Sequence, residues 1–280
     1  MKISIIGVGL IGGSIALKLK NKGIASKVFG IDKNNDHLEE ALQLGIIDEK
    51  LNLEDGIKNS DLIIIAIPVD ASRAILPIIL DAIEDQQTVM DVGSTKFGIT
   101  QAVKNHPKRK RYVSFHPMWG TENSGPKSAQ IESFSDRAAV ICNQEESAED
   151  AVKIVEKIAE NLGMHTIYMD AEAHDIHTAY ISHISHITSY ALANTVLEKE
   201  KEEDTIFQLA SSGFSSTVRL AKSHPEMWVP IFKQNKENVL DVLNEHITQL
   251  RKFKSALEKD NYEYLEELIR NANKIRGILK

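Results

Sequence analysis

The chain has 280 residues, more than one domain usually contains, so its length favours two packed units. Hydrophobic residues make up 42% and charged residues 26%, a globular composition that argues against a disordered, collagenous or coiled-coil chain. The 40 acidic and 33 basic side chains leave a net charge of −7, which argues against nucleic acid or an anionic membrane as the main partner.

The single cysteine, Cys142, excludes an intramolecular disulfide and favours a reducing compartment, although a chain that never needed disulfides would look the same. The apolar N-terminus is interrupted by glycines at positions 7, 9, 12 and 13, long before it reaches the length of a membrane span. We therefore predict a cytoplasmic protein without a signal peptide or transmembrane helix, whose partners are small molecules or other proteins.

Short runs rich in β-branched residues alternate with helix-like stretches over residues 1–169, the pattern of a parallel sheet covered by helices. Because most of these runs lack polar alternation, the strands are predicted to be buried on both faces. Strands are predicted at residues 2–7, 26–32, 61–68, 88–93, 111–117, 137–142 and 165–169, and helices at 11–22, 35–44, 70–84, 95–105 and 147–162.

From residue 170 to 280 the pattern is helical throughout, with breaks near Gly213 and Pro225. The stretch 171–198 is apolar or small around most of its circumference and is therefore predicted to be buried. A helical domain of this size rarely buries such a helix alone, so we predict a homodimer built through it. The charged run Glu198–Asp204 is predicted to be a solvated helix end or loop.

Gly7, Gly9 and Gly12 form a G-x-G-x-x-G motif directly after a predicted strand and directly before a predicted helix, the context of a dinucleotide-binding Rossmann domain. Asp32 ends the second predicted strand, where a carboxylate accepts hydrogen bonds from ribose hydroxyls and repels a 2′-phosphate. NAD is therefore favoured, although Lys33 leaves NADP open, and a glycine-rich turn without a ligand is the structural alternative. The predicted cofactor-binding residues are Gly7, Gly9, Leu10, Ile11, Gly12, Asp32 and Pro68.

Further polar residues follow the predicted strands at their carboxyl ends, where open α/β sheets bind ligands. Asp91, Ser94 and Lys96 in DVGSTK are candidates to line the crevice, unless Ser94 or Thr95 only caps a helix. His116 lies at the end of another predicted strand, where a neutral imidazole can accept the proton that an alcohol loses on oxidation.

Histidines at positions 174, 177, 183 and 186 have the i, i+3 spacing that can hold a transition metal on a helix. No carboxylate or cysteine cluster completes a ligand set, so no metal site is predicted. His174 and Asp175 can equally belong to the domain junction.

Five segments, GVGLIGGS, DVGSTK, HPMWGTENSG, SHISH and GFSSTVRLAKSHPEMW, together resemble the prephenate dehydrogenase family, over residues 5 to about 235. The resemblance implies oxidative decarboxylation of prephenate to 4-hydroxyphenylpyruvate with NAD, in tyrosine biosynthesis. It also implies a homodimer with an N-terminal doubly wound Rossmann domain, placed here at residues 1–169, and a C-terminal helical substrate and dimerisation domain at residues 170–280.

Carried onto this sequence, the resemblance makes His116 the catalytic base that accepts the ring hydroxyl proton as hydride leaves C4 for nicotinamide. Ser94 matches a serine that orients the same hydroxyl. The residues that match substrate-binding positions are His183, Arg219, Thr121 and Trp228, with Arg219 on a carboxylate of prephenate. An arginine fits this role physically, because its planar fork pairs with a carboxylate in two places.

The sequence departs from the family pattern at Ser185, where proline is usual, and at Ser215 and Ser216, where an acidic residue is common. The choice between prephenate and arogenate therefore stays open, and a dual-specificity cyclohexadienyl dehydrogenase is the first alternative. Hydroxyacid and 6-phosphogluconate-type dehydrogenases would carry a lysine at the start of the long helix, where this chain has histidines. A remote alternative is a non-catalytic NAD-binding sensor. Too few residues remain for a regulatory ACT domain, so tyrosine feedback, if it occurs, is expected at or near the active site.

Overall fold

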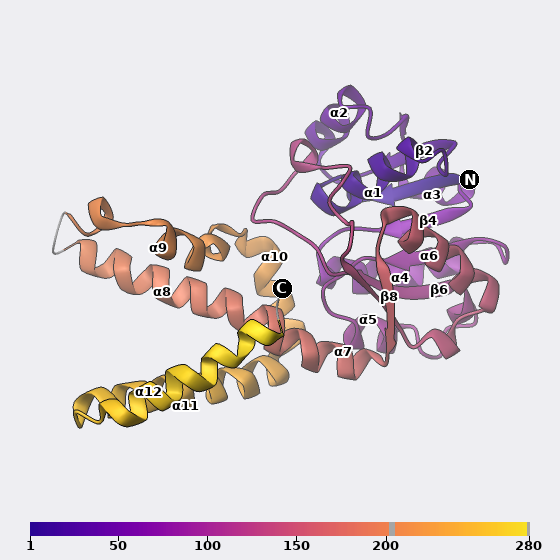
Figure 1. Cartoon of the computed structure of the whole chain (residues 1–280). Coiled ribbons are helices and arrows are strands. Elements are labelled where there is room, and N and C mark those ends of the chain that lie inside the picture. Colours follow the sequence, from indigo (N-terminus) through magenta and orange to yellow (C-terminus); the bar gives the residue numbers. More distant parts are fainter. Residues whose placement is uncertain (202–204, 279–280) are drawn as a thin grey trace. The chain divides into compact units, whose positions relative to one another are not determined.

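Eight strands form one sheet in the first part of the chain, and Figure 1 shows helices packed around it. The structure is a computed structural model that describes residues 1–201 and 205–278. Neighbouring strands follow the order β3-β2-β1-β4-β5-β6-β7-β8. Each predicted strand range contains one strand, whereas the two-residue β3 was missed because it is too short to give an apolar run. The strands are β1 Lys2–Ile6, β2 Lys27–Ile31, β3 Glu49–Lys50, β4 Leu62–Ile65, β5 Thr88–Asp91, β6 Tyr112–Pro117, β7 Ala138–Cys142 and β8 His165–Met169.

Helices connect most of these strands, and all five predicted helices are present. Asn34 caps one of them by accepting a hydrogen bond from the Asp36 N–H, and Gly163 ends another in the left-handed conformation. The helices are α1 Leu10–Asn21, α2 Asn35–Gln43, α3 Leu53–Lys58, α4 Val69–Ala82, α5 Phe97–Ala102 and α6 Glu149–Leu162, with short turns η1 Arg109–Arg111, η2 Pro126–Ser128 and η3 Gln144–Glu146. The six-residue α3 was not predicted.

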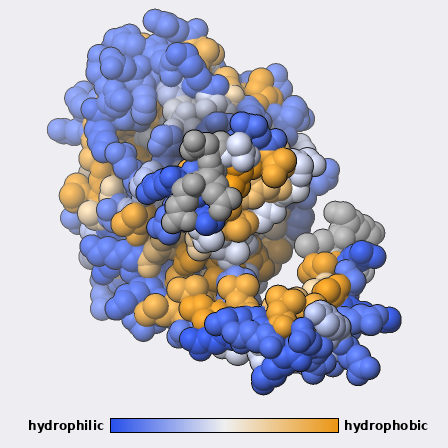
Figure 2. Space-filling model, turned by 90° about the vertical axis from the view of Figure 1, so that its left-hand side faces the viewer, coloured by the Kyte–Doolittle hydropathy of each residue, from blue (hydrophilic) through white to orange (hydrophobic). Residues whose placement is uncertain are grey.

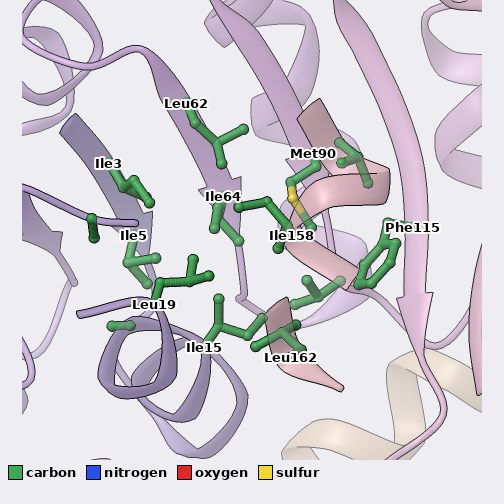
Figure 3. Close-up of a cluster of buried hydrophobic side chains, with 14 of the residues drawn as sticks. Ile3, Ile5, Ile15, Leu19, Leu62, Ile64, Met90, Phe115, Ile158 and Leu162 are labelled. Atoms are coloured by element: carbon green, nitrogen blue, oxygen red, sulfur yellow. The ribbon is translucent and has the colours of Figure 1, made fainter. Parts of the chain in front are cut away.

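Helices cover both faces of the sheet, which confirms the doubly wound α/β class. Successive residues of β4 point to opposite faces, so Ile64 belongs to one buried cluster and Ile63 and Ile65 to the other. Figure 3 shows the first cluster, in which side chains of α1 and α6 such as Ile15 and Leu162 pack against the central strands. Each fully buried side chain of this kind contributes about 1.5–3 kcal/mol to stability.

The sheet is not wholly parallel, which corrects the prediction. β6 and β7 are antiparallel, with His116 opposite Val140, whereas every other neighbouring pair is parallel. A parallel neighbour requires a long crossover, usually a helix, and the connection from Pro117 to Ala138 contains only the short η2. The helix α6 then makes β8 parallel to β7.

The prediction that the strands are buried on both faces is also wrong for β8. This strand forms one end of the sheet, and all five of its residues, including Tyr168, are exposed or half-buried. The central strands β4, β5 and β6 are buried throughout. An apolar run therefore indicates a strand, but its place in the sheet decides how much of it is covered.

After Met169 the described residues form helices and turns but no strand. The chain divides into two compact units, Met1–Asn235 and the residues from Lys236 onward, which are described separately. The predicted domain boundary after residue 169 stays a prediction. The first unit contains α7 Ala171–Thr178, the π-helical turn η4 Ala179–His183, α8 Ile184–Glu200, η5 Ile206–Leu209, α9 Ser212–Thr217, η6 Arg219–Lys222 and α10 Pro225–Gln234, and the second contains α11 Lys236–Glu258, α12 Tyr262–Ala272 and η7 Asn273–Gly277.

The predicted breaks near Gly213 and Pro225 are both confirmed, because α9 begins at Ser212 after the non-helical residues 210 and 211, and α10 begins at Pro225. Of the charged run Glu198–Asp204, residues 202–204 lie outside the described part of the chain. None of the helices within residues 1–201 and 205–278 combines the length and the apolar character that a membrane span requires.

The stretch 171–198 is not buried throughout within the single chain, contrary to the prediction. In α8 only Ser189 is buried, while Ile181 in η4 is 66% exposed and Leu197 is 51% exposed. On the side of the molecule drawn in Figure 2, hydrophobic residues lie on the surface. A pattern that is apolar all round indicates that a helix is covered, but it does not say by which chain.

Candidate active site

The carboxyl ends of four neighbouring parallel strands bring most of the predicted site residues to one edge of the sheet. β1, β4, β5 and β6 lie side by side in that order. The glycine loop follows β1, Pro68 follows β4, Ser94 follows β5, and His116 lies near the end of β6. This edge is where open α/β sheets bind their ligands.

The glycines of the loop between β1 and α1 serve two different purposes. A Cβ on Gly12 would lie 2.1 Å from the Gly7 carbonyl oxygen, and Gly7 itself has a φ of +96°, so both are required by the packing of the loop. A Cβ on Gly9 would meet no protein atom closer than the Gly125 nitrogen, at 4.0 Å. The lack of a side chain at Gly9 therefore leaves a cradle at the start of α1, where the backbone N–H groups of Leu10 and Ile11 have no partner within the helix.

Asp32 is held beside this loop by backbone hydrogen bonds. Its carboxylate accepts from the Val8 N–H at 3.1 Å and from the Asn34 N–H at 2.9 Å. His37 Nδ1 lies 3.9 Å from the same carboxylate. The chain thus places an acidic group at the end of β2, next to the glycine cradle, as a ribose-binding position requires.

Asp91 and Lys96 do not line a crevice, which corrects their prediction as crevice residues. Both side chains are buried, and the Lys96 ammonium donates to the Asp91 carboxylate and to the Phe115 carbonyl oxygen. The Tyr112 hydroxyl also donates to Asp91, at 2.6 Å, and burial raises the pKa of this tyrosine well above its usual value. These charged groups form an internal support for the loop that carries Ser94.

Ser94 itself is half-buried, and its hydroxyl makes no hydrogen bond to the residues that the structure describes. The suggestion that Ser94 or Thr95 caps the next helix is wrong, because the N-cap of α5 is Lys96 and no side chain within this segment caps it. The Asp175 carboxylate of α7 takes that role, accepting from the Lys96 N–H at 2.7 Å and the Phe97 N–H at 3.0 Å.

His116 is 9% exposed and belongs to a chain of three polar side chains. Its Nδ1 lies 2.8 Å from His174 Nε2, and His174 Nδ1 lies 2.8 Å from Asp175 Oδ1. Burial, followed by the proximity of His174, Lys96 and His183, holds the pKa of His116 well below its usual value. The imidazole is therefore neutral near pH 7 and able to accept a proton.

His183 lies in the π-helical turn η4 and is almost fully buried. Its Nδ1 lies 3.2 Å from the Asn235 amide nitrogen, which also donates to the Asp175 carbonyl oxygen at 2.6 Å. Because that amide nitrogen is a donor, His183 Nδ1 is an acceptor and His183 Nε2 carries the proton. Burial lowers the pKa of His183 to about 4, so the ring is neutral and offers an N–H donor.

Trp228 of α10 lies between two histidines and against the start of α4. Its ring stacks on His186 at 3.4 Å between centroids and meets the edge of His183 at 5.9 Å. Trp228 also packs against Val69, the residue after Pro68. The indole Nε1 is buried and has no hydrogen-bond partner among the described residues, which leaves a donor in this region unused.

Arg219 pairs with Glu122, a residue that the sequence did not single out. Arg219 Nη1 donates to the Glu122 carboxylate at 2.8 Å, with the arginine side chain 52% exposed. Hydrogen bonds from its own backbone N–H and from Arg219 lower the pKa of Glu122. Thr121 precedes it in the loop after β6 and accepts from the Asn123 N–H.

Most of the predicted residues thus fall into three groups. The glycine loop and Asp32 form one, His116 and the Ser94 loop are joined through His174 and Asp175, and Trp228 and His183 form the third. Arg219 and Thr121 lie outside these contacts. No local signal pointed to Glu122, Asp175 or Asn235 as partners, since each meets residues more than 50 positions away. Within the described residues no cluster of three histidine, cysteine or acidic side chains could hold a metal ion.

Two family models match the chain in succession. The nucleotide-binding domain of prephenate dehydrogenase matches residues 15–168, and the dimerization domain of prephenate dehydrogenase matches residues 170–271.

Individual relatives match over nearly the whole chain. Prephenate dehydrogenase of Bacillus subtilis is 31% identical over 277 residues, which cover 98% of this chain and 75% of the relative. Cyclohexadienyl dehydrogenase of Zymomonas mobilis is 29% identical over 280 residues, covering 99% and 96%. The crystal structure of prephenate dehydrogenase from A. aeolicus, in complex with hydroxyphenyl propionate and NAD⁺, has a TM-score of 0.90 and 30% identity, covering 100% of this chain and 99% of that one.

Proposed function

The chain belongs to the prephenate dehydrogenase family, and from this membership we propose that it converts prephenate to 4-hydroxyphenylpyruvate with NAD, as a step of tyrosine biosynthesis. The observation that carries the proposal is the buried, neutral imidazole of His116 at the same sheet edge as the glycine cradle. A base in this place serves an oxidation that removes a proton from a hydroxyl group.

The cofactor site fits NAD. The Gly9 cradle and the N–H groups of Leu10 and Ile11 would hold the pyrophosphate, and the Asp32 carboxylate would accept from the ribose hydroxyls. The same carboxylate would repel the extra phosphate of NADP. Pro68, at the start of α4, lies at the edge where the nicotinamide half would reach. NAD, when bound, supplies the acceptor for the hydride, and the A. aeolicus relative solved with NAD⁺ supports this choice.

The residues around the base fit the substrate half of the reaction. The His116 imidazole would accept the proton of the ring hydroxyl, and the unpaired Ser94 hydroxyl would hold the same group in place. Loss of carbon dioxide from the oxidised ring restores aromaticity, so the protein has to position the substrate and move one proton. His183 and Trp228 each offer a buried N–H donor to the substrate.

Prephenate carries two carboxylates and this chain has a net charge of −7, so binding needs a local cation. Arg219 supplies this cation with its planar guanidinium group. Among the described residues, only Glu122 accepts a hydrogen bond from it, through Nη1. A substrate carboxylate can pair with the remaining guanidinium N–H groups or displace Glu122. We expect Thr121, next to Glu122, to line the same side of the pocket.

A second candidate substrate, arogenate, is favoured by Glu122. Arogenate has an ammonium group where prephenate has a keto group, and an acidic side chain beside Arg219 would bind it. The segment from Gly213 to Arg219 has no acidic residue, but the fold brings Glu122 to Arg219 from the loop after β6. The similarity to the Zymomonas mobilis cyclohexadienyl dehydrogenase agrees with a dual-specificity enzyme as the alternative.

We also propose a homodimer. The C-terminal family model describes a dimerization domain, and exposed apolar side chains such as Ile181, Leu209 and Val229 would be covered by a second copy. A cytoplasmic location remains a prediction from the single cysteine, Cys142.

The direct test measures NADH or NADPH formation at about 340 nm, with NAD or NADP and with prephenate or arogenate, in parallel. Turnover with NAD and prephenate supports the proposal, and a clear preference for arogenate selects the second candidate. Binding of NAD without turnover in any combination would refute both and leave a nicotinamide-binding sensor. A His116→Asn variant run beside the wild type controls for contaminating dehydrogenases.

A further inference from the structure

Beyond the proposed reaction, the hydrogen bonds behind His116 determine which of its ring nitrogens is the base. The starting point is the Asp175 carboxylate, whose two oxygens face three donors. Oδ1 accepts from the Lys96 N–H and lies 2.8 Å from His174 Nδ1, and Oδ2 accepts from the Phe97 N–H. A carboxylate only accepts hydrogen bonds, so the contact with His174 is a hydrogen bond in which His174 Nδ1 donates.

The second step follows from the first. A neutral imidazole carries one proton, so if His174 Nδ1 donates, His174 Nε2 has a lone pair. Burial lowers the pKa of His174 and thereby favours its neutral form. His174 Nε2 lies 2.8 Å from His116 Nδ1, and this contact is a hydrogen bond only when His116 Nδ1 donates. The proton of neutral His116 is then on Nδ1, and Nε2 carries the lone pair.

We propose that His174 and Asp175 are positioning residues that hold His116 in the tautomer whose Nε2 accepts a proton. Nε2 makes no hydrogen bond to any described residue, so it is the atom left for the substrate. The inference rests on the proposed function in one respect, namely that the proton accepted by Nε2 comes from the substrate hydroxyl. A third group that holds an imidazole in one tautomer recurs in catalytic triads and at metal-binding histidines.

Asp175 also connects the base to the loop that carries Ser94. The two N–H groups that it accepts belong to Lys96 and Phe97, directly after that loop. One carboxylate on α7 therefore sets the tautomer of His116 and holds the backbone beside the serine. Both positioning residues lie beyond the predicted domain boundary at residue 169, so the base is complete only when α7 is docked against the sheet.

The first test measures the tautomer itself, on the full chain labelled with ¹⁵N-histidine at about pH 7.5. Two-bond ¹H–¹⁵N correlations distinguish the protonated ring nitrogen from the unprotonated one, and the His116→Asn spectrum assigns the signals of His116. We expect His116 with the proton on Nδ1 and a bare Nε2. A proton on Nε2 in the wild type would overturn the inference, whatever the protein turns over.

The second test replaces His174. His174→Leu removes both ring nitrogens and should lower kcat about 10- to 100-fold, with NAD affinity unchanged and a mixed tautomer at His116. His174→Gln retains an acceptor and a donor and should restore kcat to within about threefold of the wild type. His177→Leu, at an exposed histidine of the same helix, is the matched control and should behave as the wild type.

The outcomes separate this inference from the proposed function. A wild type that turns over no cyclohexadienyl substrate but shows the Nδ1–H tautomer refutes the function and supports the positioning role. An active wild type in which the leucine and glutamine variants lose kcat equally refutes the role of His174 as an acceptor and leaves the function standing. If His174→Leu does not fold, the wild-type tautomer and the kcat of the glutamine variant still test the positioning role of His174.

Discussion

Replacing His183 by glutamine should make the free energy of unfolding less sensitive to acid. Burial lowers the pKa of His183 from 6.5 to about 4 in the folded protein. Below pH 6.5 the unfolded chain binds a proton on this ring, whereas the folded protein does so only near pH 4, so stability present above pH 6.5 is lost as the pH falls. One pKa unit corresponds to about 1.4 kcal/mol, so between about pH 7.5 and pH 5 this ring should cost about 2 kcal/mol.

The assay is urea unfolding at these two pH values, with the free energy extrapolated to water and the protein concentration held constant because the proposed dimer would add to stability. His116 and His174 also have lowered pKa values and add to the acid sensitivity of every variant alike. His183→Gln should therefore lose about 2 kcal/mol less than the wild type on acidification. His177→Gln, at an exposed position of α7, should lose as much as the wild type. An equal loss in the His183→Gln variant would refute the assigned pKa.

Three further predictions concern the site. His116→Asn should lower kcat about 10²- to 10⁴-fold with little change in NAD affinity, because it removes a general base; full turnover would exclude that role. Arg219→Ala should raise the KM for prephenate about 10- to 100-fold at nearly constant kcat, as expected for a lost hydrogen bond to a carboxylate, and an unaltered KM would place the arginine outside the site. Gly9→Val should weaken NAD binding at nearly unchanged Tm, whereas Gly12→Ala should lower Tm, because its Cβ would meet the Gly7 carbonyl oxygen at 2.1 Å. The reverse pattern in thermal unfolding and NAD titration would contradict this division.

The local sequence determined the strands, most of the helices and the cofactor loop. Continuous β-branched runs such as residues 61–68 form strands because they bury both faces, and helices end where glycines such as Gly163 permit a left-handed backbone. The glycine motif requires only neighbours along the chain, namely a strand, a turn and a helix. Signals of this kind depend on residues within a few positions of one another, so they can be recognised in the sequence without knowledge of the tertiary structure.

Only the tertiary structure decided which polar side chains pair with one another inside the protein and which remain available to bind a ligand. Asp91 and Lys96 looked like crevice residues in the sequence, but they neutralise each other in the interior. His174 and Asp175 lie behind His116 because α7 packs against the start of α5, and Glu122 meets Arg219 across 97 positions of sequence. The antiparallel direction of β7 likewise became visible only in its pairing with β6. Hydrogen bonds and ion pairs act over a few ångströms in space, so a partner distant in sequence leaves no local pattern to predict it from.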